Sequence, residues 1–169
     1  MRNLTKKLLS VLLALALACE LLAVAAHATY GAGTKFVVLG DSIAAGEGAS
    51  APANAYMRLI AGPREYVLCP HAVGGDDSFD LLKILAEDDG KGALEDIRTA
   101  DIIDISIGGN DLLASNVITL VLRLIFLNDT EAADEYIEAF RPRFAQIVEE
   151  IRRLNPDAPV QSSSIYHPK

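Results

Sequence analysis

The sequence predicts a layered α/β domain built on a parallel sheet. Three short runs rich in apolar and β-branched residues, at 35–39, 66–69 and 101–107, each lead into a glycine turn and then into helical sequence. This order of strand, turn and helix is typical of a parallel sheet with right-handed crossovers. The length of 169 residues, with 51% hydrophobic and 22% charged residues, fits one globular domain.

The first 28 residues have the pattern of a secretory signal. Three basic residues within the first seven precede an apolar run at 8–18, and Ala26-His27-Ala28 has the small-x-small pattern at which signal peptidases cut. A retained membrane anchor is the first alternative, although Glu20 within the segment disfavours it. Lipid attachment at Cys19 is the second, although alanine replaces the leucine usual three residues earlier. We expect a secreted or extracytoplasmic protein with no membrane span after cleavage.

The expected mature chain comprises a linker at 29–34 and a domain at 35–169. The loss of three basic residues and one acidic residue on cleavage takes the formal net charge from −8 to −10. Such a charge disfavours nucleic acid as a partner and gives no attraction to anionic membranes. Only Cys69 then remains of the two cysteines, which excludes an intramolecular disulfide. The oligomeric state stays open.

Helical patterns follow the strand candidates. Ser78 is a candidate N-cap for an apolar pattern at 79–85. Apolar residues recur at steps of three or four through 130–154, where Pro142 should kink the helix or mark its effective start. The apolar segment 117–127 is interpreted as a buried helix or, alternatively, as a lid over the substrate.

The end of the sequence is consistent with a fourth strand. Asn155-Pro156 should end the long helix, and 159–166 then occupies the place of a strand. Three consecutive serines in that segment are unusual for a parallel strand, which is normally apolar on both faces.

Polar motifs follow three of the expected strands and should meet at one edge of the sheet. They are the segments 40–42, 74–76 and 108–111. Ser42 stands at a strand-to-helix turn, where a hydroxyl is exposed and amides at the helix start can donate to an oxyanion. The Gly75 backbone N–H and the Asn110 side-chain amide could donate to the same point, which would make an oxyanion hole with three donors.

In sequence order, these motifs resemble blocks I, II and III of the SGNH/GDSL hydrolase family. The matching stretches read GDSIAAGEG at 40–48, AVGGDDSFDLL at 72–82 and ISIGGND at 105–111, and the resemblance covers nearly all of 35–168. It implies a flavodoxin-like three-layer α/β/α fold and hydrolysis of acyl esters of small molecules, lipids or glycans. It further implies that Ser42 is the nucleophile that forms an acyl-serine, with the Ser42 amide, Gly75 and Asn110 as oxyanion donors. No metal or organic cofactor is implied.

One family motif is absent. Block V, an Asp-x-x-His that supplies the general base, does not occur in residues 112–169. We therefore expect a chain truncated before its last strand and helix, and weakly active or inactive in this form. His71 or His167 could substitute as the base. The competing interpretation is a pseudoenzyme that retains the oxyanion pocket and binds a ligand without catalysis.

The remaining polar features have simpler explanations than metal binding or catalysis. We expect 88–92 to form a solvated turn, Asp76-Asp77 to supply charges at a helix start, Asp41 and Asp111 to support their turns, and Cys69 to pack in the core.

Overall fold

Strand β1, Lys35–Gly40, forms the centre of the sheet. Its residues Phe36 to Leu39 are fully buried, as expected for a strand covered on both faces. It pairs in parallel with β2, Val67–Pro70, on one side and with β3, Ile102–Ser106, on the other. Strand β4, Val160–Ser162, pairs in parallel with β3, which gives the order β2-β1-β3-β4. The predicted parallel α/β sheet is confirmed, and the bounds of the first three strands differ from the predicted ones by one residue.

The computed structural model describes residues 30–87, 90–114 and 131–162. All of these except Tyr30 belong to one unit, Gly31–Lys169. The predicted signal sequence at 1–28, the apolar segment 117–127 and the end of the predicted fourth strand lie outside the described residues. Within the described ranges, no helix is both long and apolar enough to cross a bilayer.

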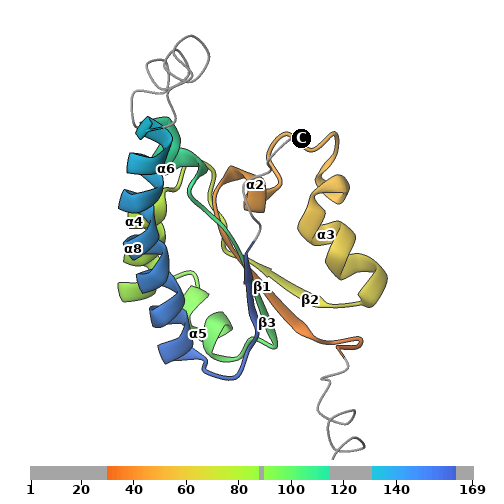
Figure 1. Cartoon of the computed structure of the whole chain (residues 1–169). Coiled ribbons are helices and arrows are strands. Elements are labelled where there is room, and N and C mark those ends of the chain that lie inside the picture. The colour runs from red at the N-terminus through yellow and green to blue at the C-terminus, as the bar shows by residue number, and fades with distance from the viewer. Residues whose placement is uncertain (1–29, 88–89, 115–130, 163–169) are drawn as a thin grey trace, which may run out of the picture. The chain divides into compact units, whose positions relative to one another are not determined.

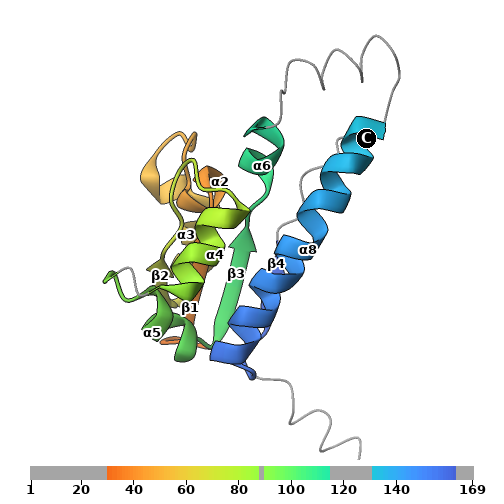
Figure 2. The ribbon, with the colours of Figure 1, turned by 90° about the vertical axis from the view of Figure 1, so that its left-hand side faces the viewer.

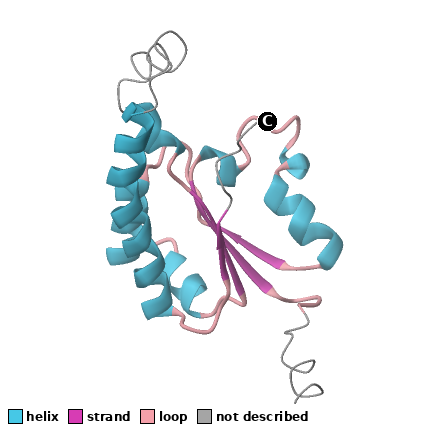
Figure 3. Cartoon of the chain, viewed as in Figure 1, coloured by secondary structure: helices cyan, strands magenta, loops and turns pink. Residues whose placement is uncertain are grey.

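Helices cover both faces of the sheet and complete three layers (Figures 1 and 3). The α-helices are α2 (Ser42–Ala45), α3 (Tyr56–Ala61), α4 (Ser78–Ala86), α5 (Ala93–Arg98), α6 (Gly109–Ala114) and α8 (Glu131–Leu154). Single 3₁₀ turns, Pro52–Asn54 and Gly62–Arg64, flank α3. Helices α4, α5 and α8 lie on one face, as Figure 2 shows from that side, and α2 and α3 lie on the other.

Alternate residues of β1 supply the two halves of the core. Val37 and Leu39 pack with α4, α5 and α8, whereas Phe36 and Val38 pack with α2 and α3. Full burial of one such side chain contributes about 1.5–3 kcal/mol, so these four residues hold all three layers together.

The expected N-cap of α4 is wrong, and so is the helix start, one of the two alternatives for Pro142. Asp77, not Ser78, is the N-cap of α4: its side chain accepts from the backbone N–H groups of Phe79 (2.8 Å) and Asp80 (3.1 Å), in a capping box that Asp80 completes. Helix α8 begins at Glu131 and continues through Pro142, which is therefore not its start. Because Pro142 is exposed, water can hydrate the backbone carbonyl that lacks its usual donor.

Candidate functional site

Backbone hydrogen bonds join the loops that follow the first three strands. The Val73 N–H, after β2, donates to the Gly40 carbonyl at the end of β1, 2.9 Å away. On the other side, the Asp41 N–H donates to the Ser106 carbonyl at the end of β3, also at 2.9 Å. The ends of β2 and β3 therefore flank the turn that carries Ser42, at the edge where ligands bind in open α/β sheets.

Ser42 is the first residue of the four-residue helix α2. Asp41 is its N-cap, and the buried Asp41 carboxylate accepts from the Ile43 N–H at 3.0 Å. Ala44 is fully buried beneath the helix and anchors it to the sheet. Ser42 itself is half-buried, so its hydroxyl is held on a fixed turn that remains accessible from solvent.

The Gly75 turn reaches the same region from the end of β2. Gly75 has a φ of +93°, which favours glycine, and space is open where a Cβ would stand. Its neighbour Gly74 lies against the carboxylate of Glu47, close to α2, because a Cβ on Gly74 would be 1.8 Å from Glu47 Oε1. The turn after β2 is thus packed against the loop after α2.

Asn110 lies in the first turn of α6, directly after β3. Its Nδ2 donates to the backbone carbonyl of Asp76 at 2.8 Å, which links the turn after β3 to the turn after β2. Nδ2 carries two hydrogens, so the second can donate to an oxyanion. The structure therefore brings Ser42, Gly75 and Asn110 onto three turns that hydrogen bonds connect to one another.

A buried polar cluster behind these turns was not predicted from the sequence. The side chains of Ser78, Asp111 and Arg143 meet there, from α4, α6 and α8 respectively. Asp111 accepts from the Ser78 N–H (2.8 Å), the Ser78 hydroxyl and Arg143 Nη2 (3.2 Å), and Arg143 Nε donates to Ser78 Oγ at 2.7 Å. Asp111 thus supports its turn, as expected. Arg143 gave no local signal, since it is 32 residues from Asp111 and 65 from Ser78.

Aromatic residues of α8 pack beside the same turn. The Tyr136 hydroxyl donates to the Gly108 carbonyl, and burial raises the pKa of Tyr136 to about 12. Phe140 stacks on Tyr136 with a centroid distance of 6.0 Å and covers the α-carbon of Gly108. Together with Arg143, these side chains of α8 contact and stabilise the segment that follows β3 and carries Asn110.

His71 is bonded to α5 and not to Ser42. Its Nε2 lies 2.6 Å from Asp96 Oδ2, and Lys35 Nζ lies 2.8 Å from Asp96 Oδ1. Hydrogen bonds from Lys35 and then from His71 lower the pKa of the Asp96 carboxyl. The Asp96 carboxylate thus holds the His71 ring toward α5. His167, the other histidine considered as a base, lies outside the described residues.

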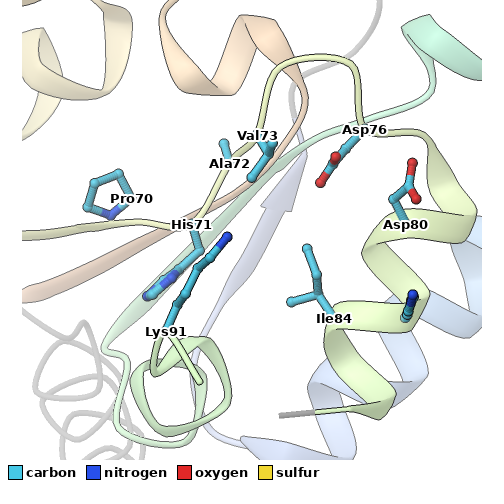
Figure 4. Close-up of a pocket in the computed structure, with 9 residues that line it drawn as sticks. Pro70, His71, Ala72, Val73, Asp76, Asp80, Ile84 and Lys91 are labelled. Carbon is cyan, nitrogen blue, oxygen red and sulfur yellow. The ribbon is translucent and has the colours of Figure 1, made fainter. Parts of the chain in front are cut away.

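A pocket of about 400 Å³ lies between the end of β2 and α4 (Figure 4). Burial, followed by the charges of Asp80 and Asp77, raises the pKa of Asp76 on its wall. The residues that line it are Pro70, His71, Ala72, Val73, Asp76, Asp80, Lys83, Ile84 and Lys91. None of the three predicted site residues is among them, so this pocket is distinct from the Ser42 turn.

Comparisons with known proteins agree with the motif resemblance. The model of the GDSL-like lipase/acylhydrolase family matches residues 38–168. An uncharacterized protein from Bacillus subtilis (strain 168), YpmR, is 37% identical over 99 residues, which are 58% of this chain and 35% of that protein.

Solved structures show the same fold. The lipase Lip_vut3 from a goat rumen metagenome superposes with a TM-score of 0.60 and 25% identity, over 79% of this chain and 64% of that one. The extracellular lipase of Streptomyces rimosus gives a TM-score of 0.55 at 23% identity, over 77% of this chain and 59% of that one. Phospholipase A1 of Streptomyces albidoflavus NA297 gives a TM-score of 0.57 at 22% identity, over 78% of this chain and 59% of that one. The chain thus spans less than two thirds of each of these relatives.

Proposed function

Because the chain belongs to the GDSL-like lipase/acylhydrolase family, we propose that it hydrolyses carboxylic esters through an acyl intermediate on Ser42. The observation that carries this proposal is the hydrogen-bonded connection of three turns, in which Asn110 Nδ2 binds the Asp76 carbonyl and the turns after β2 and β3 flank the Ser42 turn.

The proposed reaction has two steps. Ser42 Oγ gives its proton to a general base and attacks the acyl carbonyl, and negative charge develops on the carbonyl oxygen. The Ser42 N–H, the Gly75 N–H and Asn110 Nδ2 donate to that oxygen, and the alcohol leaves after it takes up a proton. Water then attacks the acyl-serine and releases the acid. We assign the general base to none of the described residues.

An acyl ester with an apolar acyl group is the proposed substrate class. Ile43, next to the nucleophile, is 61% exposed. This apolar side chain beside the Ser42 hydroxyl would contact an acyl chain. The similarity to the lipase Lip_vut3 supports the same class.

A serine-directed fluorophosphonate tests the nucleophile in the full chain. We expect covalent labelling at Ser42, mapped by mass spectrometry, and its loss in Ser42→Ala. Ser50→Ala is the matched control, since Ser50 is an exposed serine eight positions away, and its labelling should equal that of the wild type. Labelling that persists in Ser42→Ala would contradict the proposal.

Ligand binding without catalysis is the second candidate, and the observation that favours it is that no hydrogen bond joins His71 to Ser42 in the described part of the chain. It predicts retention of an acyl ester or its product with no release of p-nitrophenol from p-nitrophenyl butyrate. Turnover by this chain that disappears in His71→Ala would instead identify His71 as the base.

Export is also part of the proposal. The basic start, the apolar run and Ala26-His27-Ala28 support cleavage after residue 28. The protein recovered from its native host should then begin at Thr29, which N-terminal peptide mapping would detect. A mature chain that retains Met1 or residues of the apolar run would contradict cleavage.

A further inference from the structure

We infer that Arg143 is a positioning residue for the oxyanion donors, acting through Ser78 and Asp111; this inference rests on the proposed esterase function. We call these three side chains the Arg143 clasp. They come from three helices, and two of them lie close in sequence to the proposed donors Gly75 and Asn110.

The clasp has a fixed geometry. Arg143 Nε donates to Ser78 Oγ at 2.7 Å, and Arg143 Nη2 donates to Asp111 Oδ1 at 3.2 Å. Ser78 closes the cluster through its own N–H, 2.8 Å from Asp111 Oδ2, and through its hydroxyl. Two nitrogens of one planar guanidinium thus bind two partners at a fixed spacing, which a lysine ammonium cannot reproduce.

Burial makes these contacts costly to break. The side chain of Asp111 is 2% exposed and Ser78 is fully buried, whereas the Arg143 side chain is 22% exposed. A carboxylate at that depth needs its donors, since an unpaired buried charge is strongly disfavoured. The guanidinium also lies 4.5 Å from the ring centroid of Phe79, which restricts its plane.

Two clasp residues lie close to the donors in the sequence. Ser78 follows Gly75 by three residues, and Asp111 is adjacent to Asn110. The Asn110 side chain bonds across the same gap to the Asp76 carbonyl at 2.8 Å. The turn after β2 and the turn after β3 are therefore joined twice, once by the Asn110–Asp76 bond and once by the Ser78–Asp111 bonds, and Arg143 holds both members of the second pair. Loss of the Arg143 contacts should shift the Ser78–Asp111 pair and so change the spacing of the two donors.

Donor spacing matters more for the transition state than for substrate binding. An oxyanion hole accelerates the reaction because its donors already stand where negative charge develops. A small displacement of such groups therefore lowers the rate of the chemical step and leaves ground-state binding nearly unchanged. If Arg143 served only stability, its substitution would lower the melting temperature without a selective loss in the rate of the chemical step.

Two variants separate these possibilities. Arg143→Lys keeps the positive charge but loses the planar guanidinium with its two donor nitrogens. Arg143→Met removes the charge and keeps an unbranched side chain that can pack on Phe79. Arg141→Lys is the matched control, because Arg141 lies on the same helix and pairs at 3.1 Å with Glu138 on the exposed face. Circular dichroism selects the variants that remain folded, and Ser78→Ala replaces Arg143→Met if that variant unfolds.

The first readout is the position of the donors in the full chain, independent of activity. We expect the ¹H–¹⁵N signals of the Asn110 side-chain amide and of the Gly75 backbone amide to shift in Arg143→Lys and to stay in place in Arg141→Lys. Unchanged signals in Arg143→Lys would overturn the clasp.

The second readout is the rate of Ser42 phosphonylation by a fluorophosphonate. In that step the Ser42 Oγ–P bond forms, the P–F bond breaks, fluoride leaves and the hydroxyl proton passes to solvent. We expect the maximal rate to fall about tenfold or more in Arg143→Lys, with little change in the half-saturating probe concentration. An equal rate, or a loss confined to probe affinity, would overturn the positioning role. A wild-type chain that is not labelled at Ser42 would overturn the proposed function, and the amide signals would then decide the clasp alone.

Discussion

The α-carbon of Gly40 lies against the backbone carbonyl of Ser106, so closely that a Cβ at residue 40 would be 1.8 Å from that oxygen. The same oxygen accepts the Asp41 N–H at 2.9 Å, and Gly40 itself has a φ of +128°. Strands β1 and β3 are thus in tight backbone contact where the chain turns toward Ser42. Only glycine fits this position, for reasons of both space and backbone conformation.

Gly40→Ala should therefore destabilise the protein strongly. A clash with a backbone oxygen cannot be relieved by a rotamer change, so we expect a loss of more than about 2 kcal/mol in the free energy of unfolding. Urea denaturation measures it. Gly62→Ala is the control: Gly62 has a φ of −59° and open space, and this substitution should be neutral or add about 0.4–1 kcal/mol. Similar losses in the two variants would contradict this explanation.

Asn155 connects the loop after α8 to the loop after α5. Its buried Nδ2 donates to the carbonyls of Ile97 (2.8 Å) and Ala100 (3.0 Å), and its Oδ1 accepts from the Ala158 N–H at 3.0 Å. Asn155→Ala leaves these backbone groups without their partner and should cost about 3 kcal/mol in unfolding free energy.

The exposed Asn54 provides the comparison for Asn155. It makes a side-chain bond of 2.7 Å to Ser50, so Asn54→Ala should cost less than about 0.5 kcal/mol. Asn155→Asp places a buried carboxylate oxygen against the Ile97 and Ala100 carbonyls, so it should destabilise the protein at least as much as Asn155→Ala at pH 7. Chemical denaturation of all three variants gives the order, and an Asn155→Ala protein as stable as Asn54→Ala would refute the assignment.

Stability at low pH should depend on Asp96. Its folded-state pKa is lowered by Lys35 and then by His71, so the folded protein binds this proton more weakly than the unfolded chain. The resulting stabilisation is present above the unfolded value of about 3.9 and is lost as the pH falls through the lower folded value. In Asp96→Asn the protein should be less stable at pH 7, with a difference from wild type that shrinks as the pH falls below about 3.9. Lys35→Met should reduce the same difference. A constant offset at every pH would contradict the prediction.

The contribution of Asp104 to folding stability should have the opposite pH dependence. Burial raises the pKa of this carboxyl, although a 2.6 Å bond from the Tyr56 hydroxyl opposes the shift. The folded state therefore holds the proton more tightly than the unfolded chain, and stability falls as the pH rises from about 3.9 through the folded value. Asp104→Asn removes this titration, so its stability relative to wild type should increase as the pH rises above about 3.9. Parallel stability curves would show that Asp104 does not titrate in this range.

The strands and their parallel arrangement were predictable because local patterns determine them. The run Phe36–Leu39 is apolar on both faces, and few environments other than the centre of a parallel sheet bury both. The glycine motifs then had to meet at one edge of the sheet. Helix α3, Tyr56–Ala61, was not predicted, since six residues are too few for a helical period to be recognised.

The supporting contacts of the site were not predictable in this way. Serine is a common N-cap residue, but the Ser78 hydroxyl bonds to Asp111 and Arg143 instead. The preceding residue, Asp77, caps the helix. Tertiary contacts decide between two adjacent residues that are both suitable caps. The roles of Arg143 and Asn155 depend in the same way on partners more than 30 residues away.

Helix α8 has two halves with different partners. Ile147 and Ile151 are fully buried against the sheet, whereas Tyr136, three turns earlier, bonds to the Gly108 carbonyl. Partial unfolding of the N-terminal turns would release Tyr136 and leave the sheet intact, so its free energy should lie below that of global unfolding. Amide hydrogen exchange should then divide α8 into a faster first half and a slower second half. On heating, the turn that holds Asn110 would lose its support while most of the protein is still folded.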